Sequence, residues 1–245
     1  MNQVINLLGV NLRFHSPTEA QKQIKFWLSQ VGPLRQVVTV NPDFIITARR
    51  NKKFAAILQS ADLVTVDGSG IVYAARFLGQ PINFSDRLTG VELTERLLTT
   101  AEKLHLPVAI VLPSQAYSSP QKIEQTLSAR WPNLKVTIYN LSEGSQLTKC
   151  DAKIVFVALG APEQELWIAE HQDWLKTASI ALGIGGTFDY LSGTIKRAPR
   201  FVRFLGLEWL WRLIRRPLRM MRRIYRSVIL FPLLIFCQKI CRQPK

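Results

Sequence analysis

Residues 36–70 read QVVTVNPDFIITARRNKKFAAILQSADLVTVDGSG, and this stretch decides the fold. An apolar, β-branched run at 36–40 begins it, and a second such run at 63–66 closes it before Asp-Gly-Ser-Gly. Between the two runs, apolar residues recur at helical spacing over 44–60. Near-continuous apolar strands joined by a helix are typical of a parallel sheet that is covered on both faces.

The same alternation of strand and helix continues in both directions from this stretch. We expect strands at 4–10, 36–40, 63–66, 108–112, 135–139, 153–159 and 179–184. We expect helices at 18–30, 44–60, 70–78, 90–104, 120–130 and 163–176. The sequence therefore predicts an α/β, Rossmann-like fold with a mostly parallel sheet and helices on both faces.

Polar residues and glycines follow several of these strands at the point where each strand ends. They are Thr39, Asn41 and Asp43, then 67–70, 87–90, 160–165 and 183–189. In open parallel sheets, ligands bind beyond the carboxyl ends of the strands. Glycines at helix starts also let backbone N–H groups approach a pyrophosphate. The pattern is compatible with a nucleotide-sugar site at this edge of the sheet.

Several other kinds of site have no signature in the sequence. It contains no Gly-rich loop that ends in Lys-Ser or Lys-Thr, no Gly-x-Ser-x-Gly and no His-Glu-x-x-His. The three histidines and three cysteines lack metal-ligand spacing, and the odd cysteine count fits a reducing compartment. The start MNQVINLLGVNLRFHS lacks a basic region, a long apolar core and a cleavage site. We therefore expect no secretory signal, no metal and no cofactor.

Positive charge is concentrated at the C-terminal end of the chain. Residues 196–226 hold 11 Lys or Arg and one acid, Glu208, whereas residues 1–195 hold 18 Lys or Arg against 16 acids. A charge confined to one segment predicts a docking surface for a polyanion, either nucleic acid or an anionic membrane. On this basis we divide the chain into an α/β body, 1–195, and a C-terminal appendage, 196–245.

The pattern inside the appendage favours the membrane. On a helix from residue 207, the arginines form one stripe about 120° wide, and large apolar residues cover the rest of the circumference. This is the composition of a basic amphipathic helix in a bilayer interface, and it disfavours nucleic-acid binding. A helix packed on its own protein, with solvated arginines, is the alternative. The residues that we expect to associate with the membrane are Trp209, Trp211, Arg215, Arg216, Arg222 and Arg223.

An apolar run at 228–237 follows this helix, which Pro217 should kink or divide. The run has ten residues and is broken by Pro232, whereas a spanning helix needs about 20. We therefore expect a shallow anchor rather than a membrane span. An apolar tail face without a membrane would also favour self-association, so a homo-oligomer is a further expectation.

Several motifs in order resemble the WecG/TagA/CpsF family, which is glycosyltransferase family 26. The motifs are Thr39-Val-Asn41-Pro-Asp43, Asp67-Gly68-x-Gly70, Arg87-x-Thr89-Gly90, Gly160-x-Pro162-x-Gln164-Glu165 and Phe188-Asp189-x-x-x-Gly193-x-x-Lys196-Arg197-Ala198-Pro199. The stretch LEWLWRL at 207–213 and Pro217-x-Arg219 are similar to the end of that family. The resemblance thus runs from about residue 4 to residue 226. One stretch departs from it: Pro113-Ser114-Gln115 stands where a Gly-rich turn is expected, which weakens the case for a ligand role of that loop.

The resemblance implies an inverting, metal-independent glycosyltransferase of cell-surface polysaccharide or teichoic acid synthesis. Such an enzyme would move an N-acetylmannosamine-type or related hexose from a UDP-sugar to a sugar on an undecaprenyl-diphosphate-type lipid. A lipid-linked acceptor explains why an α/β body would carry a basic tail that lies peripherally on the cytoplasmic side of the cell membrane. Tail arginines would take the place of a metal ion on the leaving diphosphate.

The resemblance also assigns roles to single residues. Asp67 would be the general base that takes the proton from the acceptor hydroxyl, although a helix N-cap is the alternative. Thr39 and Asn41 would bind the donor sugar or orient the acceptor, against ordinary turn chemistry. Arg87 would contact a phosphate or the acceptor, unless it pairs with Asp86 or Glu92.

Four further residues complete the substrate-binding set. Gln164 would hydrogen-bond the sugar or the uracil, while Glu165 would serve the helix start. Arg212 and Arg219 would contact the diphosphate, with Arg197 as the alternative. Two other functions stay open at this point: an NAD(P)-dependent oxidoreductase, and a non-catalytic, membrane-associated nucleotide-binding protein with the same fold. The first would use Gly68 and Gly70 as its phosphate loop, although the third glycine of that fingerprint is missing.

Overall fold

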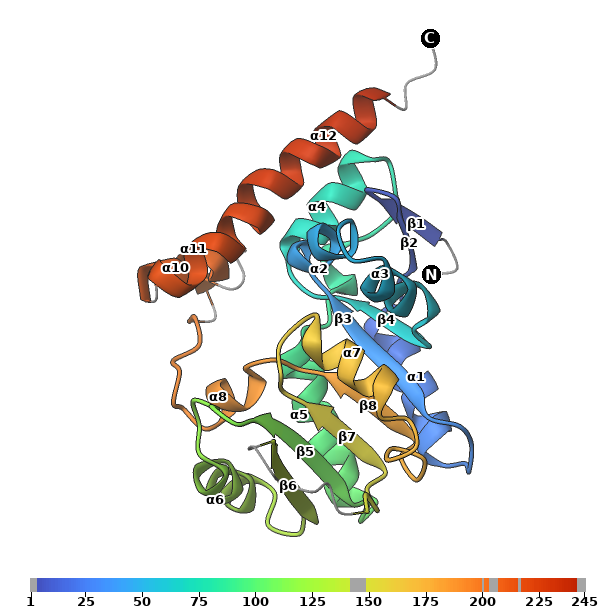
Figure 1. Cartoon of the computed structure of the whole chain (residues 1–245), viewed down its shortest axis with the longest axis vertical. Helices are drawn as coiled ribbons and strands as arrows, with labels where there is room; N and C mark the ends of the chain where they lie inside the picture. Colours follow the sequence, from blue (N-terminus) through green and yellow to red (C-terminus); the bar gives the residue numbers. More distant parts are fainter. Residues whose placement is uncertain (1–3, 142–148, 200, 203–206, 216, 242–245) are drawn as a thin grey trace.

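The computed structural model describes residues 4–141, 149–199, 201–202, 207–215 and 217–241. A parallel sheet of six strands forms the centre of the molecule (Figure 1). In spatial order its strands are β4 (Leu63–Val66), β3 (Arg35–Val40), β8 (Ile180–Gly183), β7 (Ile154–Val157), β5 (Val108–Pro113) and β6 (Val136–Leu141). All neighbouring strands pair in parallel. The predicted α/β, Rossmann-like fold is confirmed.

Helices cover both faces of this sheet, because side chains alternate between the faces along each strand. Val37 of β3 belongs to the core beneath one group of helices, whereas Val38 and Val40 belong to the core beneath the other group. The first group is α1 (Pro17–Leu28), α5 (Gly90–Lys103) and α6 (Pro120–Arg130). The second is α2 (Pro42–Ala48), α3 (Lys52–Ser60) and α4 (Ser69–Phe77), with α7 (Glu163–Glu170) covering the strands beside them.

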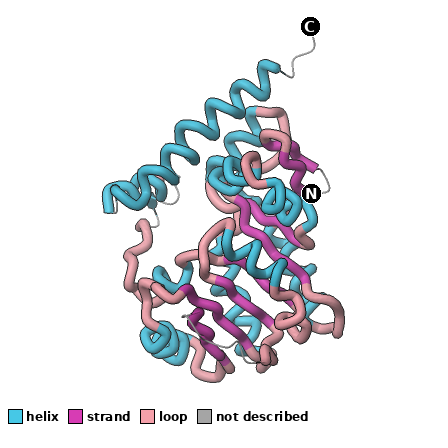
Figure 2. Tube along the Cα trace, in the orientation of Figure 1, coloured by secondary structure: helices cyan, strands magenta, loops and turns pink. Residues whose placement is uncertain are grey.

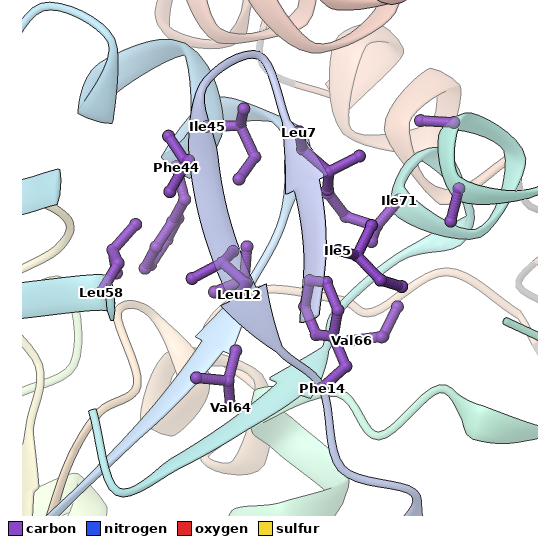
Figure 3. Packing of buried hydrophobic residues seen from close by; sticks show 14 of the residues in the cluster. Ile5, Leu7, Leu12, Phe14, Phe44, Ile45, Leu58, Val64, Val66 and Ile71 are labelled. Carbon is purple, nitrogen blue, oxygen red and sulfur yellow. The ribbon is translucent and has the colours of Figure 1, made fainter. Parts of the chain in front are cut away.

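The N-terminal segment differs from the expectation of one strand over 4–10. It forms an antiparallel hairpin of β1 (Val4–Leu7) and β2 (Val10–Arg13), which turns at Leu8 and Gly9, both with positive φ. The inward side chains of the hairpin, including Ile5, Leu12 and Phe14, pack against β4, α2 and α4 (Figure 3). The hairpin thus closes the end of the core that the sheet leaves open.

Two helical expectations change in detail, and two short elements are additional. The helix expected over 44–60 is divided into α2 and α3, because Asn51 accepts the Phe54 N–H and begins a new helix. The helix expected over 163–176 ends at Glu170. A short helix α8 (Thr187–Leu191) and a 3₁₀ turn η1 (Phe84–Asp86) were not expected.

The predicted C-terminal helical appendage is confirmed, and it lies along the end of the molecule that carries α2, α4 and the hairpin (Figures 1 and 2). It consists of α10 (Glu208–Arg215), α11 (Pro217–Ile224), a π-helical turn η2 (Tyr225–Leu230) and α12 (Phe231–Cys241). α11 begins at Pro217, as expected for a residue that favours the first helical position.

The end of the appendage is packed on the body along one face, which the expectation of a shallow anchor did not include. Phe231 and Ile235 are almost fully buried in the same cluster as the hairpin. Gln238 joins the hairpin by accepting the Leu8 N–H (2.8 Å) and donating to the Asn6 carbonyl (3.1 Å). One face of α12 is therefore part of the protein core.

The length argument against a membrane span also needs correction. The helical segment Met221–Cys241 has 21 residues and a mean hydropathy of 1.6, which is long and apolar enough to cross a membrane by length and composition. The count of ten residues covered only the apolar run 228–237, whereas the helix begins before this run at Met221, continues through Pro232 and ends at Cys241. A membrane span would have to withdraw Phe231 and Ile235 from the core, so their burial argues against spanning.

Candidate active site

A cavity of about 730 Å³ lies between the carboxyl ends of β3 and β4 and the C-terminal helices. Its polar part is lined by Asn41, Asp67, Ser69, Arg87 and Arg223. Its apolar part is lined by Tyr73 and Phe77 of α4 and by Val228, Phe231 and Phe236 of the appendage. A single cavity therefore joins a charged end, at the strand ends, to an apolar end beneath the tail.

Asp67 is the first residue after β4, and its N–H donates to the Val40 carbonyl (2.8 Å). The side chain is half-buried and lines the cavity. The N-cap of α4 is Gly68, with φ +94° and no side chain to act as a cap. The N-cap position of α4 is therefore held by Gly68 and not by Asp67.

Asn41 and Arg87 reach the same cavity from two different loops. The Asn41 Oδ1 caps α2 by accepting the N–H groups of Asp43 (3.0 Å) and Phe44 (3.3 Å). This leaves the Asn41 Nδ2 as the side-chain atom that can donate to a ligand.

Arg87 runs beside the end of β4, where the Leu88 N–H donates to the Val66 carbonyl. Its buried Nε has no hydrogen-bond partner among the described residues. The expected alternatives, Asp86 and Glu92, are engaged in the caps of η1 and α5 instead. Buried donors are normally paired, so this nitrogen is a candidate for ligand binding.

Thr39 lies next to the start of α5 rather than on the large cavity. A Cβ placed on Gly90 would be 3.3 Å from the Thr39 Oγ1 and 3.9 Å from the Thr187 Oγ1. Arg197 approaches the same helix start, where its Nη2 donates to the Thr89 Oγ1 (3.5 Å) and its buried Nε has no described partner. Hydroxyls and an arginine thus gather at the N-terminus of a 14-residue helix, which is a favourable place for an anion.

Gln164 is buried and joins two glycine loops. Its Oε1 accepts the N–H groups of Gly160 (3.1 Å) and Gly185 (2.9 Å), and its Nε2 donates to the Glu165 carboxylate (2.7 Å). Glu165 lies in the first turn of α7, as expected, and it is buried; this burial raises the pKa of Glu165 to about 8. The structure thus shows Gln164 holding the loops after β7 and β8 together; contact with substrate stays a prediction.

A second, smaller cavity of about 170 Å³ lies at the ends of β5, β7 and β8. Its wall includes Pro113 and Gln115, from the stretch 113–115, and also Ser118. Asp189 holds Ser118 in place, because the Asp189 Oδ1 accepts the N–H (3.1 Å) and the hydroxyl (2.7 Å) of Ser118. The sequence reasoning did not single out Ser118, and it included Thr187 only within the range 183–189. Hydroxyl residues close to strand ends were the available signal, but they are common in every turn.

The appendage residues expected at the membrane are distributed differently in the structure. Trp209 lines the large cavity, and the Trp211 Nε1 donates to the Lys196 carbonyl (3.3 Å). Arg215 stacks on Trp211, whereas Arg222 is exposed and Arg223 reaches the cavity. Arg216 lies outside the described residues. Arg212 and Arg219 lie on α10 and α11, but their side chains are outside the described part of the structure.

An exposed apolar surface runs along the appendage, within the amphipathic helix and the apolar run that the sequence indicated. We call it the outer stripe; its side chains recur at helical spacing and are each at least half exposed. It comprises Met221, Tyr225, Ile229, Leu233 and Ile240. The exposed Phe236 lies instead on the wall of the large cavity, where it stacks on Phe77. Among the described residues, no three His, Cys, Asp or Glu side chains are grouped as metal ligands would be.

Comparison with known proteins places the chain in a family. Residues 5–245 match the family described as Glycosyl transferase WecG/TagA/CpsF family. The chain is also similar to the N-acetylglucosaminyldiphosphoundecaprenol N-acetyl-beta-D-mannosaminyltransferases of Bacillus spizizenii and of Bacillus subtilis strain 168, with 32% and 31% identity over 195 residues. Each alignment covers 76% of this chain and 73% of the relative. The chain belongs to the WecG/TagA/CpsF family and is a glycosyltransferase.

Proposed function

We propose that the enzyme transfers an N-acetylmannosamine-type hexose from a UDP-sugar to an undecaprenyl-diphosphate-linked acceptor sugar, with inversion and without a metal ion. The observation that carries this proposal is the large cavity, which joins a carboxylate and arginines at the strand ends to apolar walls under the tail. An acceptor of this class has the same three parts: a sugar, a diphosphate and an apolar chain. The names of the relatives support the choice of sugar and lipid.

Asp67 is the group proposed to start the reaction. Its carboxylate takes the proton from the acceptor hydroxyl as that oxygen attacks the anomeric carbon of the donor. The new C–O bond forms as the bond between the anomeric carbon and the UDP oxygen breaks. Attack from the face opposite to the leaving UDP inverts the configuration. The Asn41 Nδ2, on the same cavity, orients one of the two sugars.

The leaving diphosphate gains negative charge as this bond breaks, and it needs donors and positive charge nearby. The N-terminus of α5, with Thr39 and Arg197, is the proposed diphosphate site, and Arg87 joins it from the large cavity. In the sheet, β8 lies next to β3, followed by β7 and β5. The smaller cavity, at the ends of β8, β7 and β5, is therefore further along the same edge of the sheet than the large cavity. We assign the nucleotide to that smaller cavity. Arg212 and Arg219 stay proposed diphosphate ligands.

The tail is proposed to hold the enzyme on the cytoplasmic face of the membrane. The outer stripe would enter the bilayer interface while Arg215 and Arg222 meet anionic headgroups, each basic side chain contributing about 1 kcal/mol. The apolar walls of the large cavity, Phe77 and Phe236 among them, would receive the first part of the lipid chain.

Product analysis with a set of donors tests this function. The purified enzyme is mixed with UDP-N-acetylmannosamine or other UDP-sugars and with undecaprenyl-diphosphate-N-acetylglucosamine in anionic bicelles, with and without EDTA. We expect one donor to give a β-linked disaccharide lipid that is insensitive to EDTA. A retained anomeric configuration, or loss of transfer in EDTA, would contradict the proposed mechanism. Absence of product with every donor would contradict the proposed function.

A further inference from the structure

Asp43 stands between the active-site loop and the appendage. Its Oδ1 lies 3.1 Å from the Arg226 Nε, and its Oδ2 lies 3.9 Å from the Arg223 Nε. Arg226 also donates from Nη2 to the Thr47 Oγ1 (2.6 Å), one turn further along α2. We call Asp43, Thr47, Arg223 and Arg226 the tail latch. It fixes α11 and η2 to α2, the helix that begins directly after Asn41.

The latch differs from an ordinary surface ion pair in its burial. The side chains of Asp43 and Arg226 are only 18% and 21% exposed, so salt screens this pair less than the other surface pairs of the protein. Among the described residues, the only ion pairs between the appendage and the body are those of Asp43. Residues 196–226 hold a single acid, so the arginines of the appendage must form most of their ion pairs with acids of the body.

Asp43 also acts on both sides of the large cavity. Its backbone N–H donates to the Asn41 Oδ1, which leaves the Asn41 amide nitrogen for the ligand. Its carboxylate lies beside Arg223, which lines the cavity from the appendage. We propose that Asp43 is a positioning residue for glycosyl transfer, which latches the appendage over the cavity and directs Arg223 toward the diphosphate of the acceptor. This inference rests on the proposed function for the role of the diphosphate, but the latch itself does not.

Asp43→Asn tests the inference, because it removes the negative charge and keeps the backbone N–H that orients Asn41. The matched control is Asp62→Asn, which breaks the ion pair with Arg35 (2.8 Å) on a part of the body that does not line the cavity. Thermal denaturation of each variant checks that the body is folded. The full set is wild type, Asp43→Asn, Arg226→Gln, the double variant and Asp62→Asn.

The first readout is tryptic cleavage at Arg223 of the full-length protein in native buffer. Local opening controls cleavage of a folded helix, so we expect about tenfold faster cleavage in Asp43→Asn and in Arg226→Gln. The effects of the two substitutions should be less than additive in the double variant, because both break the contact between Asp43 and Arg226. Cleavage at the wild-type rate in Asp43→Asn, or additive effects in the double variant, would overturn the latch.

The second readout is steady-state transfer with the donor and the bicelle-bound acceptor. We expect Asp43→Asn to lower kcat and raise the acceptor KM, about tenfold in kcat/KM, while the donor KM stays within about twofold. Faster cleavage with wild-type transfer would overturn the positioning role. If wild type itself transfers no sugar, the proposed function fails, and the cleavage rates still decide whether the latch exists.

Discussion

Gly70 lies in the first turn of α4, where the helix passes the Pro42 ring. A Cβ at this position would lie 2.6 Å from the Pro42 Cγ, so Gly70→Ala must displace the loop that carries Asn41. We expect a loss of stability of about 1–3 kcal/mol, typical of overpacking, and a larger loss of transfer activity. Gly32→Ala is the matched control, because a Cβ at Gly32 meets nothing within 4 Å. Denaturant unfolding and transfer assays measure both; equal behaviour of the two variants would contradict the tight contact.

Glu165 gives the protein a predictable pH dependence. Burial raises the pKa of Glu165 to about 8, so the folded protein holds a proton that the unfolded chain has released above about pH 4.5. The free energy of unfolding should therefore fall between about pH 4.5 and pH 8, by at most about 1.4 kcal/mol per pH unit. Glu165→Gln removes this titrating group. As the pH rises from about 4.5 to about 8, the unfolding free energy of Glu165→Gln should therefore increase relative to that of wild type. Denaturant unfolding from pH 5 to pH 8 measures the difference, and parallel curves would refute the raised pKa.

The sequence was informative about residues that directly follow parallel strands. Asn41 and Asp67 share one cavity because the carboxyl ends of β3 and β4 meet at one edge of the sheet, and Arg87 reaches the same cavity from the loop before α5. The sequence was not informative about the role of Gln164. A glutamine that accepts two loop N–H groups cannot be told from a sugar-binding glutamine by residue type. The partner of Arg226 was also hidden, because a helical stripe of arginines does not tell which acid of the body lies opposite.

At the scale of elements, α12 has two apolar faces with different tasks. Leu233 on the outer stripe is 58% exposed, whereas Ile235 on the inner face is 2% exposed. We expect Leu233→Asn to weaken binding to anionic vesicles about tenfold at unchanged stability, since it removes apolar area that would enter the bilayer. Ile235→Asn should instead lower the thermal midpoint, because it puts an amide into the core. Vesicle sedimentation measures membrane binding, and thermal denaturation measures stability. Unchanged vesicle binding of Leu233→Asn would contradict the membrane role of the outer stripe.

The elements themselves were predictable to different degrees. The central strands were found because runs such as 108–112 and 153–159 are apolar and β-branched, which is the pattern of a doubly covered sheet. The hairpin was missed because its turn, at Leu8 and Gly9, lies inside a run that is mostly apolar and that we interpreted as a single strand. The docking of α12 was missed because a short apolar run has the same composition whether its partner is a lipid or a protein core.

At the scale of the whole molecule, the two cavities line the carboxyl edge of one sheet, and the appendage closes the larger cavity. The appendage is also part of the fold, because Phe231 and Ile235 complete the core around the hairpin. The division into a body and an appendage implies that the body stays folded when the appendage is deleted. The packing of α12 changes that expectation, while the division at residue 195 stays a proposal.

A chain that ends at residue 226 tests this packing. It lacks two buried side chains that each contribute about 1.5–3 kcal/mol of burial, so its thermal midpoint should fall by several degrees. A chain that ends at residue 241 retains both residues and is the control. An unchanged midpoint in the shorter chain would show that α12 contributes nothing to the stability of the body.

The central claim is that the large cavity holds the acceptor against Asp67, and the most direct measurement is acceptor-dependent UDP release by wild type and Asp67→Asn. Donor affinity is measured in parallel, and Asp86→Asn is the control, because Asp86 does not line the cavity. We predict at least a roughly 100-fold lower turnover in Asp67→Asn, the range of a lost general base, with donor affinity and fold unchanged. Turnover of Asp67→Asn equal to that of wild type would contradict the account.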